Sequence, residues 1–291
     1  TLDDLTSLTA QLTTSPHVVK SVIGSSEQGR DMVMFEVTDF SVANTNKQRV
    51  WIHTAVHPSE NTAHFVTDGL LLWLVSEEPE AETLLDHVIF DVVPMANPDG
   101  DYLGNYRVTS TNINLEIQWG FPYDSTVPEI VAMRSKIEEF MGTSGNPGSH
   151  PIKLLLNLHS SHNVNYPFNF VHTPTYFQDG TGVTPSVNAL EVDWVAKLEA
   201  RSAFVALGSN QSSTLGSRPY VESMMHDRYS IDPTWDDIMA ITLEGTYQRS
   251  PRPGEANTPN DYRQVGKEIG LAIADFFGIP LAASLSGWML N

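Results

Sequence analysis

The chain has 291 residues, of which 41% are hydrophobic and 18% charged, as in a globular protein with a sizeable core. It has no cysteine, which excludes disulfides and thiolate metal ligands, and its formal net charge of −19 argues against nucleic acid and anionic membranes as partners. No apolar run reaches the roughly 18 residues that a membrane-spanning helix needs.

The predicted elements alternate between strands and helices. In chain order they are a helix over 2–12, strands over 18–23, 32–38 and 50–56, a helix over 62–75, a strand over 87–93, a helix over 127–140, a strand over 152–159, a helix over 189–204, a strand over 238–243 and a helix over 261–277. This alternation predicts an α/β fold with helices packed around a mixed sheet.

Four stretches between these elements are predicted to be irregular: residues 97–121, the turn cluster 143–149, and residues 166–186 and 208–237. Irregular segments of this length in a compact domain are often functional. No repeat or linker divides the chain, so we expect one domain over residues 1–291.

Histidines and carboxylates follow three of the predicted strands. His57 and Glu60 stand in His57-Pro58-Ser59-Glu60, after strand 50–56 and before helix 62–75; His159 ends strand 152–159, and Glu244 follows strand 238–243. The carboxyl ends of strands in an open α/β sheet are where ligands bind. Two imidazoles and one carboxylate, with one position left for water, are the ligand set of a hydrolytic zinc site.

Each of these residues also has a structural explanation. Glu60 can be a solvated residue in the first turn of its helix, Glu244 a paired surface carboxylate, and His159 a hydrogen-bonded strand-end histidine. His162, three residues further on, can replace His159 as a ligand if the strand ends later. Four such residues at one sheet edge are nevertheless better explained by a shared site.

The motifs occur in the order of a known family. H-P-x-E is followed by Asn97-Pro98-Asp99-Gly100, by Gly104-Asn105-Tyr106-Arg107, by L-H-x-x-H at 158–162 and by T-L-E at 242–244. Together with residues 23–31, this order resembles the zinc metallocarboxypeptidases, and most of all their cytosolic-carboxypeptidase-like branch. The resemblance covers nearly the whole catalytic domain. It implies a mixed, twisted sheet of the eight-stranded type flanked by helices, the zinc carboxypeptidase (phosphorylase/hydrolase-like) fold.

The resemblance also implies roles for single residues. One Zn²⁺ per chain would be held by His57, Glu60 and His159, with Glu244 as general base and Arg107 steadying the oxyanion. Judged without the family resemblance, Arg107 is explained as one partner of a surface ion pair, and Asn97-Pro98-Asp99-Gly100 predicts only a tight turn.

Three further positions are expected near the cleft. Tyr220 is a loose match to the family's mobile tyrosine, with Tyr229 as a competitor, and either can instead be a packing tyrosine. His162 and the following Asn163 are expected to line the cleft.

One segment departs from the family's pattern. In Asn112-Ile113-Asn114-Leu115-Glu116-Ile117-Gln118-Trp119, Asn114 matches a residue that supports a metal-bound histidine, but Glu116 and Ile117 replace the asparagine and arginine that grip a substrate's terminal carboxylate. An arginine binds a carboxylate through two charge-assisted hydrogen bonds, whereas Glu116 repels it. The candidates for a compensating arginine elsewhere are Arg218, Arg228 and Arg134.

These observations predict a zinc metallopeptidase that hydrolyses a peptide or amide bond, with altered recognition of the substrate terminus. The enzyme can be a carboxypeptidase, an amidase or a deglutamylase, although Glu116 and the net charge disfavour the last. The alternatives are a non-catalytic relative that keeps the fold and the metal and acts as a binding module, and another hydrolase. The chain begins at Thr1 rather than Met, so we expect that a leader has been removed or the chain shortened, and cytoplasmic, periplasmic and secreted locations all stay open. The oligomeric state is not predicted.

Overall fold

The computed structural model describes residues 1–162, 166–206, 210–247 and 250–281. The strands are β1 (Val18–Ser25), β2 (Asp31–Val37), β3 (Gln48–Thr54), β4 (Val88–Val93), β5 (Gly142–Thr143), β6 (Asn146–Pro147), β7 (Ile152–Ser161), β8 (Phe168–His172), β9 (Gln211–Ser213) and β10 (Met239–Thr246). The helices are α1 (Leu2–Leu12), α2 (Asn61–Leu74), α3 (Pro79–Leu85), α4 (Pro98–Leu103), α5 (Pro128–Met141), α6 (Tyr176–Asp179), α7 (Pro185–Arg201), α8 (Ala203–Ala206), α9 (Val221–Met225) and α10 (Pro259–Phe276).

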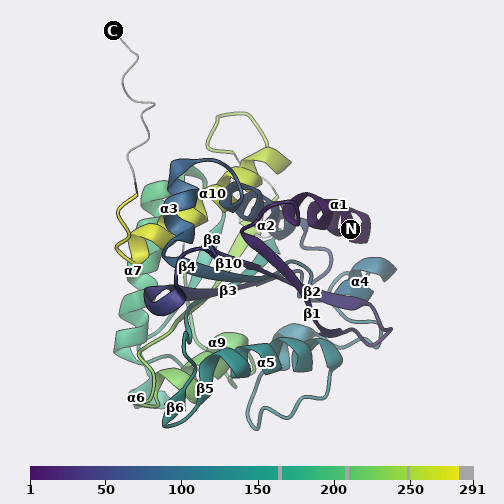
Figure 1. Cartoon of the computed structure of the whole chain (residues 1–291). Coiled ribbons are helices and arrows are strands. Elements are labelled where there is room, and N and C mark those ends of the chain that lie inside the picture. The colour runs from purple at the N-terminus through teal and green to yellow at the C-terminus, as the bar shows by residue number, and fades with distance from the viewer. Residues whose placement is uncertain (163–165, 207–209, 248–249, 282–291) are drawn as a thin grey trace.

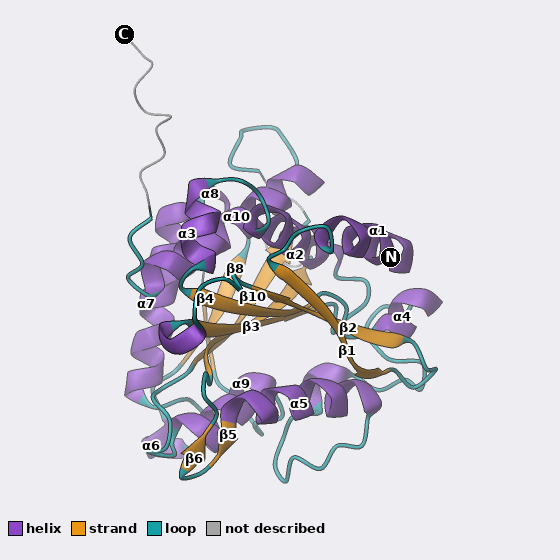
Figure 2. Cartoon of the chain, in the orientation of Figure 1, coloured by secondary structure: helices purple, strands orange, loops and turns teal. Residues whose placement is uncertain are grey.

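Eight of the described strands form one sheet in the order β1-β2-β4-β3-β7-β10-β8-β9. The central strands β4, β3, β7 and β10 are parallel, whereas β1, β2 and β8 join the sheet by antiparallel pairing. The sheet is twisted and has helices on both sides, as Figures 1 and 2 show. The predicted α/β class and the eight-stranded mixed sheet are therefore confirmed.

Each face of the sheet has its own hydrophobic core. Helices α1, α2, α3 and α10 cover one face, and α5 and α9 cover the other (Figure 1). Alternate residues of one strand supply both cores: Val50 and Ile52 of β3 pack on the α2 side, and Trp51 between them packs on the α5 side. Central strands buried on both faces explain the continuous apolar runs in the sequence.

The prediction that four segments are irregular is wrong in part. Residues 166–186 contain β8, α6 and the start of α7; residues 208–237 contain β9 and α9; and residues 97–121 begin with α4, so Asn97-Pro98-Asp99-Gly100 is more than a tight turn. The cluster 143–149 is part of a small β5–β6 hairpin. These elements are short, and most of their pairing partners are distant in sequence, so local periodicity does not reveal them.

The predicted helix over 189–204 is misplaced at both ends. The structure has α7 from Pro185 to Arg201, with Thr184 as its N-cap and Pro185 in the first turn. The other long elements lie within a few residues of their predicted bounds. Among the described helices, none is both long enough and apolar enough to cross a membrane.

Candidate metal centre

The predicted site residues come from the carboxyl ends of three neighbouring parallel strands. Strand β7 lies between β3 and β10, and its His159 is directly paired with Glu244 of β10. On the other side, Thr54 at the end of β3 pairs with Leu158 of β7. His57 and Glu60, which follow β3 in the chain, therefore lie beside the same end of β7. The sheet therefore brings together residues that are up to 187 positions apart.

The corner that carries His57 and Glu60 is held in an unusual backbone conformation. Ala55, which directly follows β3, has a φ of 60°, in the left-handed region that costs a non-glycine residue about 1–2 kcal/mol. Across the corner, a Cβ on Gly100 of α4 would lie 2.5 Å from Cγ of Pro58. The glycine of the 97–100 motif thus permits the close approach of α4 that braces the corner.

Glu60 is the centre of a group of three side chains, with His57 and His159, whose atoms are placed as candidate metal ligands; it is called the metal-ligating group below. Its Oε1 lies 2.7 Å from Nδ1 of His57, and its Oε2 lies 2.7 Å from Nδ1 of His159. The three side chains offer ligand atoms that are all within 4.8 Å of one another, and all three are buried. His162 is not in this group; it is exposed, and its Nδ1 lies 3.4 Å from the hydroxyl of Tyr106.

The outer nitrogen of each histidine has a partner of its own. Nε2 of His57 lies 3.0 Å from Oδ1 of Asn114, and Nε2 of His159 lies 3.1 Å from Oε2 of Glu116. Such partners fix the ring orientation, here with Nδ1 of each ring turned toward Glu60. The family resemblance implies that Asn114 supports a metal-bound histidine, and the histidine that it contacts is His57.

The electrostatics favour a cation at this point. Burial alone would lower the pKa of His159, but the carboxylates of Glu116 and Glu60 outweigh it and raise that pKa well above its usual value. Burial opposes ionisation of Glu60 as well, yet both histidines hold its pKa far below the usual range. The donor set of two imidazoles and one carboxylate, buried and surrounded by negative charge, fits one zinc ion.

Arg107 and Glu244 border the same group. Nη1 of Arg107 lies 3.6 Å from Oε1 of Glu60, and its side chain is 49% exposed. Glu244 has a buried oxygen, Oε2, without a hydrogen-bond partner in the described part of the chain. Burial raises the pKa of Glu244 to about 7, with Glu60 and Glu116 adding to the effect and His159 opposing it. A carboxylate with such a pKa is suited to general acid–base chemistry near neutral pH.

A cavity of about 260 Å³ opens beside the metal-ligating group and is lined by His57, His159, Arg107, Glu116, Tyr220 and Glu244. Tyr220 thus lies at the expected cleft, whereas Tyr229 is 1% exposed and packs in the α5-side core. Ile117 is not among the lining residues and is 46% exposed. Asn163 lies outside the described residues.

The three candidate arginines are engaged elsewhere. Arg218 pairs with Asp227, Arg228 with Glu138, and Arg134 with Glu138, and none of the three lines the cavity.

The structure adds lining residues that the sequence did not reveal: Glu222, His172, Phe170, Thr242 and the run Ser213, Thr214 and Leu215. Thr242 carried a usable signal, because it lies two residues before Glu244 in a strand and hence on the same face. Glu222 and His172 belong to the short elements α9 and β8, and nothing in their local sequence marks them.

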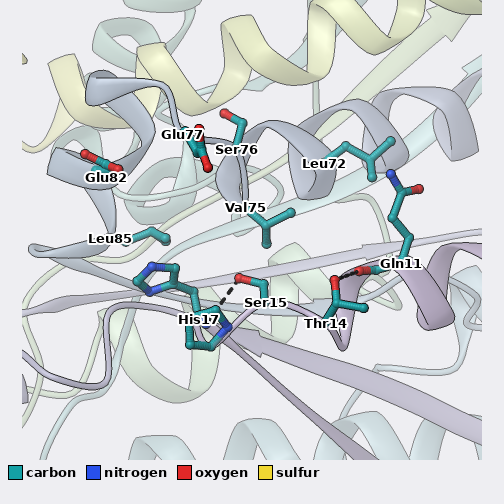
Figure 3. Close-up of a pocket in the computed structure, with 11 residues that line it drawn as sticks. Gln11, Thr14, Ser15, His17, Leu72, Val75, Ser76, Glu77, Glu82 and Leu85 are labelled. Atoms are coloured by element: carbon teal, nitrogen blue, oxygen red, sulfur yellow. Dashed lines mark hydrogen bonds between the residues drawn. The ribbon is translucent and has the colours of Figure 1, made fainter.

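A larger cavity of about 510 Å³ lies elsewhere, between the end of α1 and the helices α2 and α3 (Figure 3). His17, Glu77 and Glu82 are among its lining residues, and it shares none with the cavity at the metal-ligating group. In the described part of the chain, no set of three metal-ligating side chains converges there. Chemistry, rather than size, therefore identifies the candidate site.

Comparison with known sequences points to one family. A sequence profile described as zinc carboxypeptidase matches residues 5–117. Cytosolic carboxypeptidase 6 of Mus musculus is 33% identical over 117 residues, which cover 40% of this chain and 22% of that protein. Cytosolic carboxypeptidase 1 of Homo sapiens is 39% identical over 85 residues, or 29% of this chain and 7% of that protein. The chain therefore matches less than a quarter of the length of these relatives.

Comparison with solved structures extends the likeness to the whole fold. A metallo-carboxypeptidase from Burkholderia cenocepacia has a TM-score of 0.77 and 19% identity, over 94% of this chain and 68% of that one. A metallo-carboxypeptidase from Pseudomonas aeruginosa, solved with (2-guanidinoethylmercapto)succinic acid, has a TM-score of 0.75 and 21% identity, over 95% of this chain and 68% of that one. At these identities the likeness concerns the fold.

Proposed function

This chain resembles the zinc carboxypeptidases in the sequence of residues 5–117 and in its fold, and from that premise we propose that it is a zinc-dependent hydrolase of peptide or amide bonds. His57, Glu60 and His159 hold one zinc ion, Glu244 is the general base, and Arg107 stabilises the oxyanion. The observation that carries this proposal is the convergence of three buried ligands beside a cavity that Glu244 and Arg107 also line.

The chain's own residues can move the required proton. When bound, zinc lowers the pKa of water and polarises the substrate carbonyl. Glu244 accepts a proton from the attacking water and delivers it to the nitrogen of the leaving amine as the carbon–nitrogen bond breaks. Arg107, which lines the cavity, supplies a fixed positive charge for the substrate carbonyl oxygen, which becomes negative in the tetrahedral intermediate.

We further propose that the substrate presents a neutral or cationic group where the relatives bind a terminal carboxylate. Glu116 lines the cavity and Ile117 does not, so neither can grip a carboxylate. The three candidate compensating arginines, Arg218, Arg228 and Arg134, are held in ion pairs outside the cavity. A carboxylate facing Glu116 would be repelled.

The test compares an N-blocked peptide with a free C-terminal carboxylate against the same peptide with a C-terminal amide, both hydrolysed by the zinc-loaded protein. We expect a higher kcat/KM for the amide. A strong preference for the free acid would refute the altered recognition while leaving the hydrolase proposal intact.

The loss of the asparagine–arginine pair also motivates the second reading, a relative that keeps the metal but only binds peptides. A mixed pool of peptide acids and amides, incubated with zinc-loaded protein and followed by mass spectrometry, separates the two. Cleavage of any peptide supports the hydrolase; binding without cleavage supports the second reading.

A further inference from the structure

The helix that carries Glu60 is capped by other segments of the chain. Glu60 stands at the N-cap position of α2, where a side chain commonly accepts a hydrogen bond from the first turn. Its two carboxylate oxygens are instead turned to Nδ1 of His57 and Nδ1 of His159, each at 2.7 Å. The N–H groups of the first turn of a helix have no partner within the helix. They therefore need acceptors from elsewhere in the fold.

The hydroxyl groups of Ser160 and Tyr247 supply two of these acceptors. Oγ of Ser160 accepts a hydrogen bond from the N–H of Ala63 at 3.1 Å, and the hydroxyl of Tyr247 accepts one from the N–H of Asn61 at 3.0 Å. Ser160 lies on β7 directly after the proposed ligand of that strand, and Tyr247 directly follows β10, three residues after the proposed general base. The strands that carry the rest of the site thus also hold the start of α2.

The backbone at Glu60 forms a tight three-residue turn. Its φ of −84° and ψ of 67° are those of an inverse γ-turn. Such a turn is closed by one hydrogen bond from the third residue to the first, here from the N–H of Asn61 to the carbonyl of Ser59 at 2.9 Å. The direction in which the carboxylate leaves the chain depends on this turn, because φ and ψ of Glu60 are its soft backbone dihedrals.

Tyr247 bonds both ends of this turn through one oxygen. Its hydroxyl donates a hydrogen bond to the carbonyl of Ser59 at 2.9 Å and accepts the one from the N–H of Asn61. These two groups belong to the peptide units on either side of Glu60, so the hydroxyl restrains φ and ψ of that residue together. Tyr247 is 40% exposed, so its ring contributes little to either hydrophobic core. The hydroxyl, rather than the ring, therefore explains the residue.

We propose that Tyr247 is a positioning residue for the metal-ligating group. Its hydroxyl fixes the turn at Glu60 so that the carboxylate faces both histidines before zinc binds. This inference rests on the proposed function, since it takes Glu60 as a zinc ligand, but Tyr247 takes no part in the proposed reaction itself.

The experiment measures zinc affinity, so that it does not depend on turnover. Tyr247→Phe removes the hydroxyl and keeps the ring, and competition with a chromogenic chelator gives the affinity of the variant and of the wild type. We expect Tyr247→Phe to bind zinc about 10-fold more weakly, at the lower end of the effect of lost outer-shell partners. Tyr102→Phe, the same change at a 63% exposed tyrosine of α4, should leave the affinity unchanged.

Urea unfolding of the metal-free proteins separates positioning from a general structural role. Because the ring stays in place, we expect Tyr247→Phe without metal to unfold at nearly the wild-type midpoint. A lower midpoint with unchanged zinc affinity overturns the inference, as does a variant that does not fold, because the hydroxyl then serves the fold alone.

The remaining outcomes separate this inference from the proposed function. An unchanged zinc affinity in folded Tyr247→Phe overturns the inference even if the wild-type protein cleaves peptides. A weakened affinity in a protein whose wild type binds zinc but cleaves no peptide supports the positioning role and refutes the proposed hydrolysis. A wild-type protein that binds no zinc refutes both.

Discussion

Glu116 and His159 form a hydrogen-bonded pair, with Oε2 of the carboxylate 3.1 Å from Nε2 of the ring, while Nδ1 of the same ring lies 2.7 Å from Glu60. Glu116 also accepts hydrogen bonds from Nδ2 of Asn157, at 3.2 Å. The residue that departs from the family's pattern therefore supports a proposed metal ligand. It both lines the cavity and orients His159.

This pairing predicts that Glu116→Gln weakens zinc binding by about 10- to 100-fold, because an outer-shell carboxylate fixes the ring and increases its basicity. Competition with a chromogenic chelator measures the affinity. The control is Ile117→Ala, which changes the exposed neighbour and should leave the affinity unaltered. An unchanged affinity in Glu116→Gln would show that the hydrogen bond does not support the ligand.

Glu244→Gln should retain zinc and lose turnover. The substitution keeps the size of the side chain but removes the base, and general base catalysis contributes about 10²–10⁴-fold. Zinc content by atomic absorption and kcat on a cleaved peptide are measured on the same preparation. Activity close to the wild-type value would remove Glu244 from its proposed role.

Arg107→Gln should lower kcat by about 10²–10³-fold with a smaller effect on KM, because a charge that acts on the oxyanion is needed mainly in the transition state. Arg107→Lys should recover part of the loss. If KM rises while kcat stays constant in both variants, Arg107 serves only substrate binding.

Helices α2 and α10 pack so closely at Gly69 of α2 that the contact leaves no room for a side chain there. A Cβ at this position would overlap the backbone of Arg263, including its carbonyl oxygen. We expect Gly69→Ala to destabilise the protein by about 1–3 kcal/mol in urea unfolding, although alanine is the better helix former. Ser135→Ala, on an exposed position of α5, should change stability by less than about 0.5 kcal/mol. A Gly69→Ala protein as stable as the wild type would mean that the two helices can separate at no cost.

Asp68 should make stability depend on pH. Burial raises the pKa of Asp68 to about 6, with Arg263 opposing the shift, against 3.8 for an unperturbed aspartate. Between about pH 4 and 6 the folded state holds the proton that the unfolded state has lost, so stability falls as pH rises through this window and the loss is complete above it.

Asp68→Asn removes that titration. We expect the variant to equal the wild type near pH 4 and to exceed it at pH 8, by about 1–2 kcal/mol after allowance for solvent screening. Urea unfolding of both proteins at the two pH values measures the difference. A constant difference across the range would contradict the shifted pKa.

Much of the fold was predictable because its central elements follow simple periodicities. The strands β3, β4, β7 and β10 are apolar runs, since both faces of the sheet are covered, and α2, α5 and α10 repeat their apolar residues every three or four positions. The short elements β8, β9 and α9 were missed because they are only three to five residues long and β8 and β9 are defined by pairing across the sheet. Helix α7 was misplaced because Thr184 and Pro185, which begin it, lie in a segment read as irregular.

The sequence by itself determined the kinds of ligand, the strand ends that carry them and the resemblance to zinc carboxypeptidases, because motif order and strand-end position are local properties of the chain. Only the tertiary structure decided that Nδ1 of His57 and Nδ1 of His159 converge on Glu60, that Glu116 contacts His159, and that Glu222 lines the same cavity. The physical reason is that these relations depend on the register of parallel strands and on the packing of a five-residue helix, and neither leaves a pattern among neighbouring residues.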